Sequence, residues 1–274
     1  MEWHRRHLLR SDGGRSRVCR MRVVTIPCLS DNYAYLVADE GRREAVVVDP
    51  SEAEPVLAAL AREGLELVAI LNTHHHWDHV GANEALRGRF GELPVYGHAS
   101  DLAQGRVPAQ TVGVEEGTSF EVAGLTFRPL HVPGHTLGAV AYVVNDAVFT
   151  GDTMFVAGCG RLFEGTPAMM YASLCQKLGQ LPDETKLYCG HEYTVSNLRF
   201  AAFAEPENED VKRALVVAQE KRSRGEPTVP STMAEEHRTN PFLRVDEPGL
   251  RAKFGGTSGA ETLGKVREAK DGFR

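Results

Sequence analysis

Short apolar runs separated by turn residues dominate the chain up to residue 192 and predict β-strands. From Ala53 to Leu60, apolar side chains recur with the three- and four-residue spacing of an amphipathic helix, which Gly64 ends. Further helices are expected at Ala82–Arg89 and near Ala168–Leu178. The expected strands are Met21–Pro27, Tyr33–Ala38, Ala45–Asp49, Leu67–Asn72, Val95–Gly97, Leu125–His131, Ala139–Val144, Ala147–Thr150 and Lys186–Cys189. This alternation predicts a mixed α/β domain over residues 21–192.

Helical patterns replace the strand signals after His191. Apolar spacing predicts helices at Leu198–Ala204, Val211–Lys221 and Gly259–Ala269, separated by loops that contain proline. We therefore expect a smaller helical domain over residues 193–274. Residues 1–20 fit neither pattern, because they contain a Gly-Gly pair and little apolar content. This segment is expected to be a disordered extension, with a targeting leader as the alternative.

Composition and charge exclude several classes of protein. Of the 274 residues, 42% are apolar and 25% are charged, as in ordinary globular proteins, and no stretch approaches the roughly 20 apolar residues of a membrane helix. The net charge of −6 does not favour nucleic acid as a partner. Five cysteines without a C-x-x-C pair indicate free thiols in a reducing compartment. We expect a cytoplasmic monomer; if residues 1–20 are a transit peptide, the mitochondrion is the alternative.

A dense group of potential metal ligands directly follows an apolar run that ends at residue 72. The sequence THHHWDH at 73–79 contains four candidates, which are His74, His76, Asp78 and His79. Alternate residues of an extended chain point the same way, so His74 and His76 can share one ion. Asp78 and His79 lie past the bend, where they can face a second ion.

Three further candidate ligands each follow a glycine at the end of a predicted strand, where a sharp turn is easiest; these are His135, Asp152 and His191. The five imidazoles and two carboxylates suit zinc, iron or manganese and lack the thiolates of a structural zinc site. Seven ligands are too many for one tetrahedral ion. We therefore expect two divalent ions, with zinc favoured, about 3.5–4 Å apart and bridged by Asp152. His75 is interpreted as a non-ligand, and Asp49 as either a partner of a ligand imidazole or a turn cap.

The four short motifs resemble those of the metallo-β-lactamase superfamily: THHHWDH at 73–79, PGHT at 133–136, GDT at 151–153 and GHE at 190–192. This resemblance implies an αββα sandwich with a two-metal site along one edge. Longer motifs resemble the hydroxyacylglutathione hydrolase (glyoxalase II) family over residues 21–274, the helical part included. They are SDNYAYLV at 30–37, GDTMFVAGCGR at 151–161, CGHEYTVSNLRFA at 189–201, GEPTVPST at 225–232, NPFLR at 240–244 and VREAKD at 266–271.

The resemblance implies a role for each candidate metal ligand. One metal would be held by the three residues that match the family's first set, His74, His76 and His135. The other would be held by the second set, Asp78, His79 and His191. Asp152 would bridge the two metals, and we assign Asp78 and Asp152 to catalysis.

The resemblance also implies a glutathione-binding site at the positions of Arg161, Tyr193, Asn197, Arg267 and Lys270. Arg and Lys suit the two carboxylates of glutathione, and Arg267 and Lys270 share a face of a predicted helix because they are three residues apart. Family members often carry Lys at the position of Arg161, so the charge is kept. A Tyr of relatives is Phe163 here, which removes one hydroxyl contact.

The activity that the resemblance implies is hydrolysis of an S-2-hydroxyacylglutathione thioester to glutathione and a 2-hydroxy acid. S-D-Lactoylglutathione, which arises in methylglyoxal detoxification, is the leading example. Metal coordination lowers the pKa of water toward ~7, so a hydroxide bridging the two ions can attack the thioester carbonyl while one ion stabilises the oxyanion. The thiolate leaves with little help from a general acid, because the pKa of a free thiol is only ~8.5.

Two alternatives lie outside this reaction. A glutathione persulfide dioxygenase of the same superfamily resembles the chain at THHHWDH, but that branch uses one iron and lacks the helical C-terminal extension. The second alternative is a catalytically inactive metal-binding relative, against which the seven filled ligand positions argue. Metal stoichiometry and oxygen uptake separate the first alternative from a thioesterase, and a thioester assay separates the second.

Overall fold

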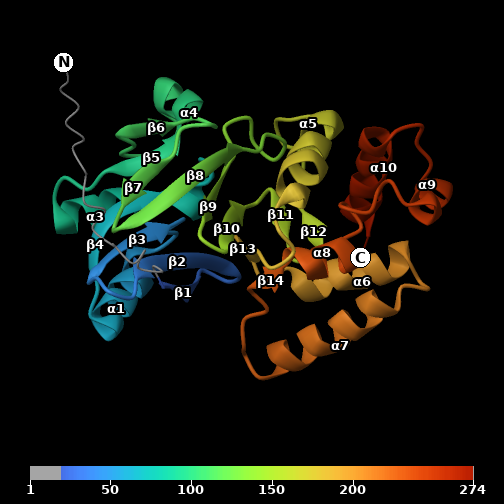
Figure 1. Cartoon of the computed structure of the whole chain (residues 1–274), viewed down its shortest axis with the longest axis horizontal. Helices are drawn as coiled ribbons and strands as arrows, with labels where there is room; N and C mark the ends of the chain where they lie inside the picture. The colour runs from blue at the N-terminus through green and yellow to red at the C-terminus, as the bar shows by residue number, and fades with distance from the viewer. Residues whose placement is uncertain (1–19, 274) are drawn as a thin grey trace, which may run out of the picture.

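Two six-stranded β-sheets face each other in the computed structural model, which describes residues 20–273, and helices cover both outer faces (Figure 1). This αββα arrangement, with a helical C-terminal region, confirms the predicted fold class. The predicted extension over residues 1–20 lies, except for Arg20, outside the described residues. None of the helices within residues 20–273 is long and apolar enough to cross a membrane.

The first sheet has the strand order β1-β2-β3-β4-β5-β6. Its first three strands are antiparallel, and β3 to β6 run parallel to one another. The strands are β1 (Met21–Cys28), β2 (Asn32–Asp39), β3 (Glu44–Val48), β4 (Glu66–Leu71), β5 (Val95–His98) and β6 (Val112–Val114). The first five confirm the predicted runs with shifts of one residue at their ends, whereas β6 was not predicted.

The second sheet has the order β14-β13-β10-β9-β8-β7 and is antiparallel except for the pair β10 and β13. Its strands are β7 (Phe120–Val122), β8 (Leu125–His131), β9 (Val140–Val144), β10 (Ala147–Gly151), β13 (Lys186–Cys189) and β14 (Ser231–Thr232). A small hairpin, β11 (Met154–Phe155) with β12 (Gly158–Cys159), follows β10. The strands that the sequence did not indicate have at most three residues, too few to show a period.

Both faces of β2 are buried, and the alternation of its side chains builds two apolar layers. Tyr35 and Val37 point into the core between the sheets, where the ring of Tyr35 packs 5.4 Å from that of Phe149 in β10. Ala34 and Leu36 point the other way, into the layer between the first sheet and its helices. Burial on both sides explains why β2 reads as a continuous apolar run.

The outer face of the first sheet is covered by helices that follow its strands. α1 buries Val56 and Leu60 against that face and ends at Gly64, whose φ of 65° is left-handed. α3 contributes Leu86 to the same apolar layer. The helices of this half are α1 (Ala53–Glu63), α2 (Trp77–Val80), α3 (Asn83–Phe90) and α4 (Ala99–Gln104).

The helix predicted near Ala168–Leu178 is confirmed, but it is not one regular α-helix. The segment consists of α5 (Pro167–Tyr171), a π-helical turn at Ala172–Lys177 and a 3-10 turn at Leu178–Gln180. Its buried apolar residues are Met170, Leu174 and Leu178, each four positions after the last. Because an α-helix turns once in 3.6 residues, a strict four-residue spacing drifts around it, and the wider π turn keeps these side chains on the core.

The helical C-terminal region packs beside the second sheet and shares its core. Phe242 and Val266 belong to the same apolar cluster as Phe149 of β10, so the core continues across the boundary predicted at residue 192. This region also supplies β14, which pairs with β13. Its helices are α6 (Thr194–Ala204), α7 (Glu209–Ser223), α8 (Met233–Thr239), α9 (Pro248–Phe254) and α10 (Gly259–Gly272).

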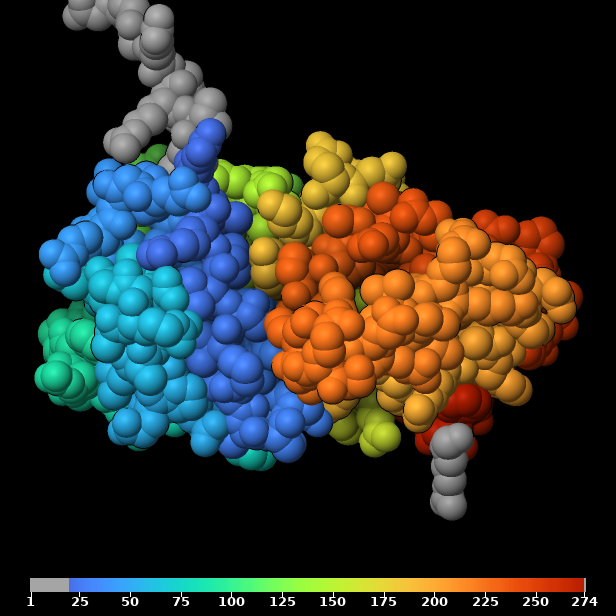
Figure 2. Space-filling model, turned by 90° about the horizontal axis from the view of Figure 1, so that it is seen from below, coloured from blue at the N-terminus to red at the C-terminus, as the bar shows by residue number. Residues whose placement is uncertain are grey.

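The first strands and the C-terminal helices lie side by side, as Figure 2 shows in blue and orange. Glu192 connects the two regions. Its carboxylate accepts hydrogen bonds from the Tyr33 hydroxyl of β2 (2.7 Å) and from the Thr228 backbone N–H beyond α7 (2.9 Å). These contacts hold the segment after β13 in place.

A fully buried carboxyl, Glu236 of α8, joins three segments of the C-terminal half. It accepts hydrogen bonds from the Ala157 N–H between β11 and β12 (2.9 Å), the Ser231 hydroxyl of β14 (2.7 Å) and the Asn240 side-chain amide (2.9 Å). Burial nevertheless raises the pKa of Glu236 from 4.5 to about 7, because the charged form is desolvated.

Replacing Glu236 by Gln should remove a pH dependence of stability. The folded state holds the Glu236 proton to higher pH than the unfolded state, so the free energy of unfolding should fall, by on the order of 2–3 kcal/mol, as pH rises from about 4.5 through about 7. Gln keeps the size and cannot ionise, so Glu236→Gln should gain stability relative to wild type between about pH 5 and about pH 8. Urea unfolding at both pH values measures this difference. The exposed control Glu220→Gln should show no such change, and a pH-independent difference for Glu236→Gln would contradict the assignment.

Candidate metal centre and substrate cavity

Four strands end at the same edge of the sandwich, and a polar side chain follows each of them. His74 comes after β4 and His135 after β8, while Asp152 directly follows β10 and His191 comes after β13. Two backbone hydrogen bonds join these ends: the Val140 N–H donates to the Thr73 carbonyl (2.8 Å), and the Gly190 N–H donates to the Gly151 carbonyl (2.9 Å). The fold therefore brings together side chains that are far apart in the sequence.

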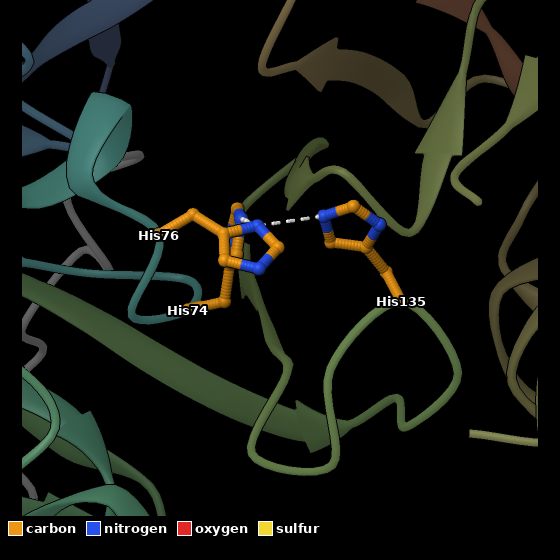
Figure 3. A group of neighbouring side chains, drawn as sticks. All are labelled: His74, His76 and His135. Atoms are coloured by element: carbon orange, nitrogen blue, oxygen red, sulfur yellow. Dashed lines mark hydrogen bonds between the residues drawn. The ribbon is translucent and has the colours of Figure 1, made fainter. Parts of the chain in front are cut away.

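Three imidazoles form the first donor set, His74, His76 and His135 (Figure 3). His76 Nδ1 lies 3.1 Å from His74 Nε2 and 3.0 Å from His135 Nε2, and Figure 3 shows His135 facing the other two rings from a separate loop. The ring nitrogens turned away from this point also have partners. His74 Nδ1 lies 3.0 Å from the Thr73 hydroxyl, and His135 Nδ1 lies 2.9 Å from the Arg161 carbonyl.

The second donor set consists of Asp78, His79 and His191. His79 Nε2 lies 3.3 Å from His191 Nε2, which lies 3.5 Å from Asp78 Oδ2. Carboxylates hold the rear nitrogens of both rings, with His79 Nδ1 3.0 Å from Asp49 Oδ2 and His191 Nδ1 2.9 Å from Asp31 Oδ1. Of the two interpretations of Asp49, the structure therefore shows the imidazole partner.

Asp152 lies between the two donor sets and faces both. Its Oδ1 is 3.3 Å from His79 Nε2, and its Oδ2 is 3.3 Å from His191 Nε2 and 3.5 Å from His135 Nε2. Oδ1 is a buried oxygen without a hydrogen-bond partner among the described residues. The two oxygens of Asp152 are therefore within 3.5 Å of ring nitrogens of both donor sets.

Charge at this edge is set by burial and by Asp152. Burial lowers the pKa of His74 well below its usual value, so that ring is neutral near pH 7. Burial acts against the charged forms of His79 and Asp152, but their attraction for each other prevails. The pKa of Asp152 is held well below its usual range and the pKa of His79 well above it. A buried anion thus stands at the centre of the site.

Two of the glycines that precede ligands are required, for different reasons. Gly151 has a left-handed φ of 50°, which L side chains rarely adopt, and a Cβ there would overlap the Thr73 hydroxyl. Gly190 has an ordinary backbone, but a Cβ there would overlap the Asp152 carboxylate and crowd the His79 ring. The sharp turn expected from the sequence explains Gly151, whereas close packing explains Gly190.

The donor groups fit a pair of metal ions. Ring nitrogens 3.0–3.3 Å apart would oppose their lone pairs unless a proton or a cation lies between them. Neutral imidazoles and carboxylates are the donors that zinc, iron and manganese accept. The nearby thiols of Cys159 and Cys189 are buried, and burial raises the pKa of Cys159 to about 11 and that of Cys189 to about 12, so neither is a thiolate near pH 7.

A cavity of about 470 Å³ opens beside this centre, and all five predicted glutathione contacts line it together with His135 and Asp152. The ring of Tyr193 stacks on that of His191, with centroids 4.7 Å apart and planes at 3°. Phe163 is 63% exposed and packs its ring 5.2 Å from that of His135. Tyr193 and Phe163 therefore supply the aromatic walls next to the donor groups.

Backbone carbonyls hold several of the polar side chains that line the cavity. Arg267 is buried and donates to the Cys159 carbonyl (2.7 Å), and Lys270 donates to the Ser196 carbonyl (3.1 Å). Burial lowers the pKa of Lys270 to about 8. The Asn197 side chain donates to the Val156 carbonyl (3.1 Å), so part of its hydrogen-bonding capacity serves the fold. Arg161 is 65% exposed and remains the most accessible of these cations.

The structure places His75 outside both donor sets. Its Nε2 faces the Arg106 guanidinium at 2.6 Å, and Arg106 also pairs with Glu164. Sequence reasoning missed these partners, as it missed Asp31 behind His191. Asp31 lies in the turn of the SDN motif between two predicted strands, where its position beside a motif was the available signal; Arg106 had none.

Comparison with known proteins agrees with this geometry. Residues 30–191 match the family described as metallo-beta-lactamase superfamily, and residues 192–273 match the family described as hydroxyacylglutathione hydrolase C-terminus. A hydroxyacylglutathione hydrolase of Synechococcus sp. is 49% identical over 261 residues, which cover 92% of this chain and all of that protein.

Two other similar proteins extend this picture. A protein of Arabidopsis thaliana named hydroxyacylglutathione hydrolase cytoplasmic is 44% identical over 261 residues, covering 93% of this chain and all of the relative. The crystal structure of ETHE1 from Myxococcus xanthus superposes with a TM-score of 0.65 at 29% identity and covers 91% of this chain and 90% of that one. The chain belongs to the hydroxyacylglutathione hydrolase family of the metallo-β-lactamase superfamily.

Proposed function

We propose that the protein hydrolyses S-2-hydroxyacylglutathione thioesters, such as S-D-lactoylglutathione, to glutathione and a 2-hydroxy acid. The observation that carries this proposal is the cavity that joins the metal-type donor groups to the cations Arg161, Arg267 and Lys270. Glutathione has two carboxylates to pair with such cations, and its thioester end can then reach the donor groups. The alignments with the similar proteins cover the whole length of those proteins, and their names support the same substrate.

The dioxygenase alternative is not favoured. The dioxygenase branch lacks a helical C-terminal extension. In this chain, by contrast, residues 192–273 match the C-terminal family of the hydrolases. The inactive alternative is opposed by the geometry, because both donor sets are complete and Asp152 faces both.

The His and Asp clusters, together with membership of the superfamily, indicate a binuclear metal site. For the individual ligands, our proposal places one ion with His74, His76 and His135 and the other with Asp78, His79 and His191, bridged by Asp152. Zinc is the proposed metal because imidazole nitrogens predominate among the donors, with iron and manganese as alternatives.

The mechanism follows from how the chain's residues are held. When bound, the two ions supply a water of lowered pKa and a Lewis acid for the thioester carbonyl. Asp49 and Asp31 fix the His79 and His191 rings from behind, which sets the tautomer and direction of each ring. Arg267 and Lys270 anchor the glutathione end, so that the thioester is presented in one orientation.

The chain needs no strong general acid for this reaction. The leaving group is a thiolate, whose conjugate acid has a pKa of roughly 8.5, so it departs without being protonated first. We also propose a cytoplasmic location, which the name of the Arabidopsis relative supports. The expectations of a monomer, and of no nucleic-acid or membrane partner, stay predictions.

Replacing Asp49 by Asn should weaken metal binding by about 10- to 100-fold, because the His79 ring loses its anionic partner. Asp49 also accepts hydrogen bonds from the Thr73 N–H (2.7 Å) and hydroxyl (2.6 Å), so the loop that carries His74 loosens as well. Competition with a chromophoric chelator measures the affinity. Asp146→Asn, which breaks a surface pair with Lys186, should leave it unchanged. Equal affinity in wild type and Asp49→Asn would refute the role of Asp49.

The purified protein should release thiol from S-D-lactoylglutathione, and removal of metal by a chelator should abolish the release. Elemental analysis of the same sample should find close to two metal ions per chain, as a binuclear centre requires. Oxygen consumption is measured in parallel with glutathione persulfide. Absence of thiol release from the metal-loaded protein would refute the proposed function, and oxygen uptake with one iron per chain would favour the dioxygenase alternative.

A further inference from the structure

The substrate cavity is lined by more cationic than anionic side chains. Among the described residues that line it, Arg161, Arg267 and Lys270 are cationic, and the carboxylates are Asp152 and Asp271. Asp152 is 8% exposed and faces the metal-type donors. Asp271 is therefore the carboxylate that belongs to the cationic end of the cavity.

The contacts of Asp271 leave it able to bind a ligand. It lies in the last turn of α10, and its Oδ1 accepts a hydrogen bond from Arg267 (3.0 Å) and lies 3.4 Å from the Arg161 Nε. Both guanidinium contacts use the same oxygen, so Oδ2 can accept a hydrogen bond from a ligand. The side chain is 44% exposed, and a molecule in the cavity can therefore reach it.

Glutathione carries groups of both signs, and so does the part of the cavity around Asp271. Two carboxylates call for cations, which Arg161, Arg267 and Lys270 supply. The remaining charge of glutathione is the α-ammonium of its γ-glutamyl residue. An ammonium placed among three cations is repelled unless an anion accompanies it, because charges a few ångströms apart near a protein surface interact by several kcal/mol.

We propose that Asp271 receives the α-ammonium of the γ-glutamyl residue and makes the protein selective for thioesters whose thiol carries that ammonium. This inference rests on the proposed function, since it assigns a further contact to the same substrate. Asp271 contributes to substrate binding. Because α10 also carries Arg267 and Lys270, this one helix binds both the positively and the negatively charged groups of the substrate.

The test compares two thioesters that differ in one group. The first is S-D-lactoylglutathione; the second is the S-D-lactoyl thioester of glutaryl-cysteinylglycine, which keeps both carboxylates and lacks only the ammonium. Wild type should prefer the first by about tenfold in kcat/KM, the range expected for a charge-assisted hydrogen bond. The preference should lie in KM, with kcat similar for both, because Asp271 does not touch the reacting atoms.

Asp271→Asn should abolish that preference and keep the metal content of wild type. Loss of the Arg267 contact will alter both thioesters alike, so the ratio between them isolates the ammonium. The matched control is Asp246→Asn, which removes another aspartate paired with an arginine, Arg251, outside the cavity lining; it should keep the preference.

Two results would overturn the assignment of Asp271. One is a wild type that hydrolyses both thioesters equally well, a comparison that needs no variant. The other is an Asp271→Asn variant that keeps the wild-type preference, which would mean that Asp271 only orients Arg161 and Arg267. Failure of the proposed function looks different, because metal-loaded wild type would then hydrolyse neither thioester.

Discussion

Seven donor groups from separate segments converge on one edge of the sandwich, and this convergence explains the close packing and the supporting carboxylates around it. Imidazole nitrogens 3.0–3.3 Å apart oppose their lone pairs unless a proton or a cation lies between them. Asp152 adds a carboxylate that faces His79 and His191 at 3.3 Å each and has one buried oxygen without a partner among the described residues. Two cations would satisfy all of these groups at once. The scaffold holds the donor groups in position for the two cations to bind.

The scaffold achieves this with strand ends and with a supporting layer of hydrogen bonds. His74, His135, Asp152 and His191 follow strands whose backbones are locked into a sheet. Gly151 and Gly190 allow the chain to turn or pack where a Cβ would not fit. Behind the rings, Asp49 and Asp31 fix His79 and His191. The C-terminal helices share the core of the second sheet. The cations of α10 are therefore held in a fixed position relative to the metal-type donors, and they do not lie on a separate, movable body.

Local sequence patterns were sufficient to predict local structure. The strands β1 to β5 were predicted within one residue of their observed ends because each is a short apolar run bounded by turn residues. The residue types around His74 pointed to a metal centre before any geometry was known. What could not be predicted depends on register across the fold. Asp31 meets His191 across 160 positions, and its place in the SDN motif was the available signal. Arg106 meets His75 across 31 positions, and no local signal indicates that contact. The two-residue strand β14 could not be predicted either, because its conformation depends on its pairing with β13.

Anomalous diffraction from crystals of the metal-loaded protein locates the ions and their ligands independently of any activity. We expect two anomalous peaks per chain, about 3.5–4 Å apart, with the carboxylate of Asp152 within roughly 2.0–2.2 Å of both. A single peak, or two peaks that do not share Asp152, would contradict this expectation.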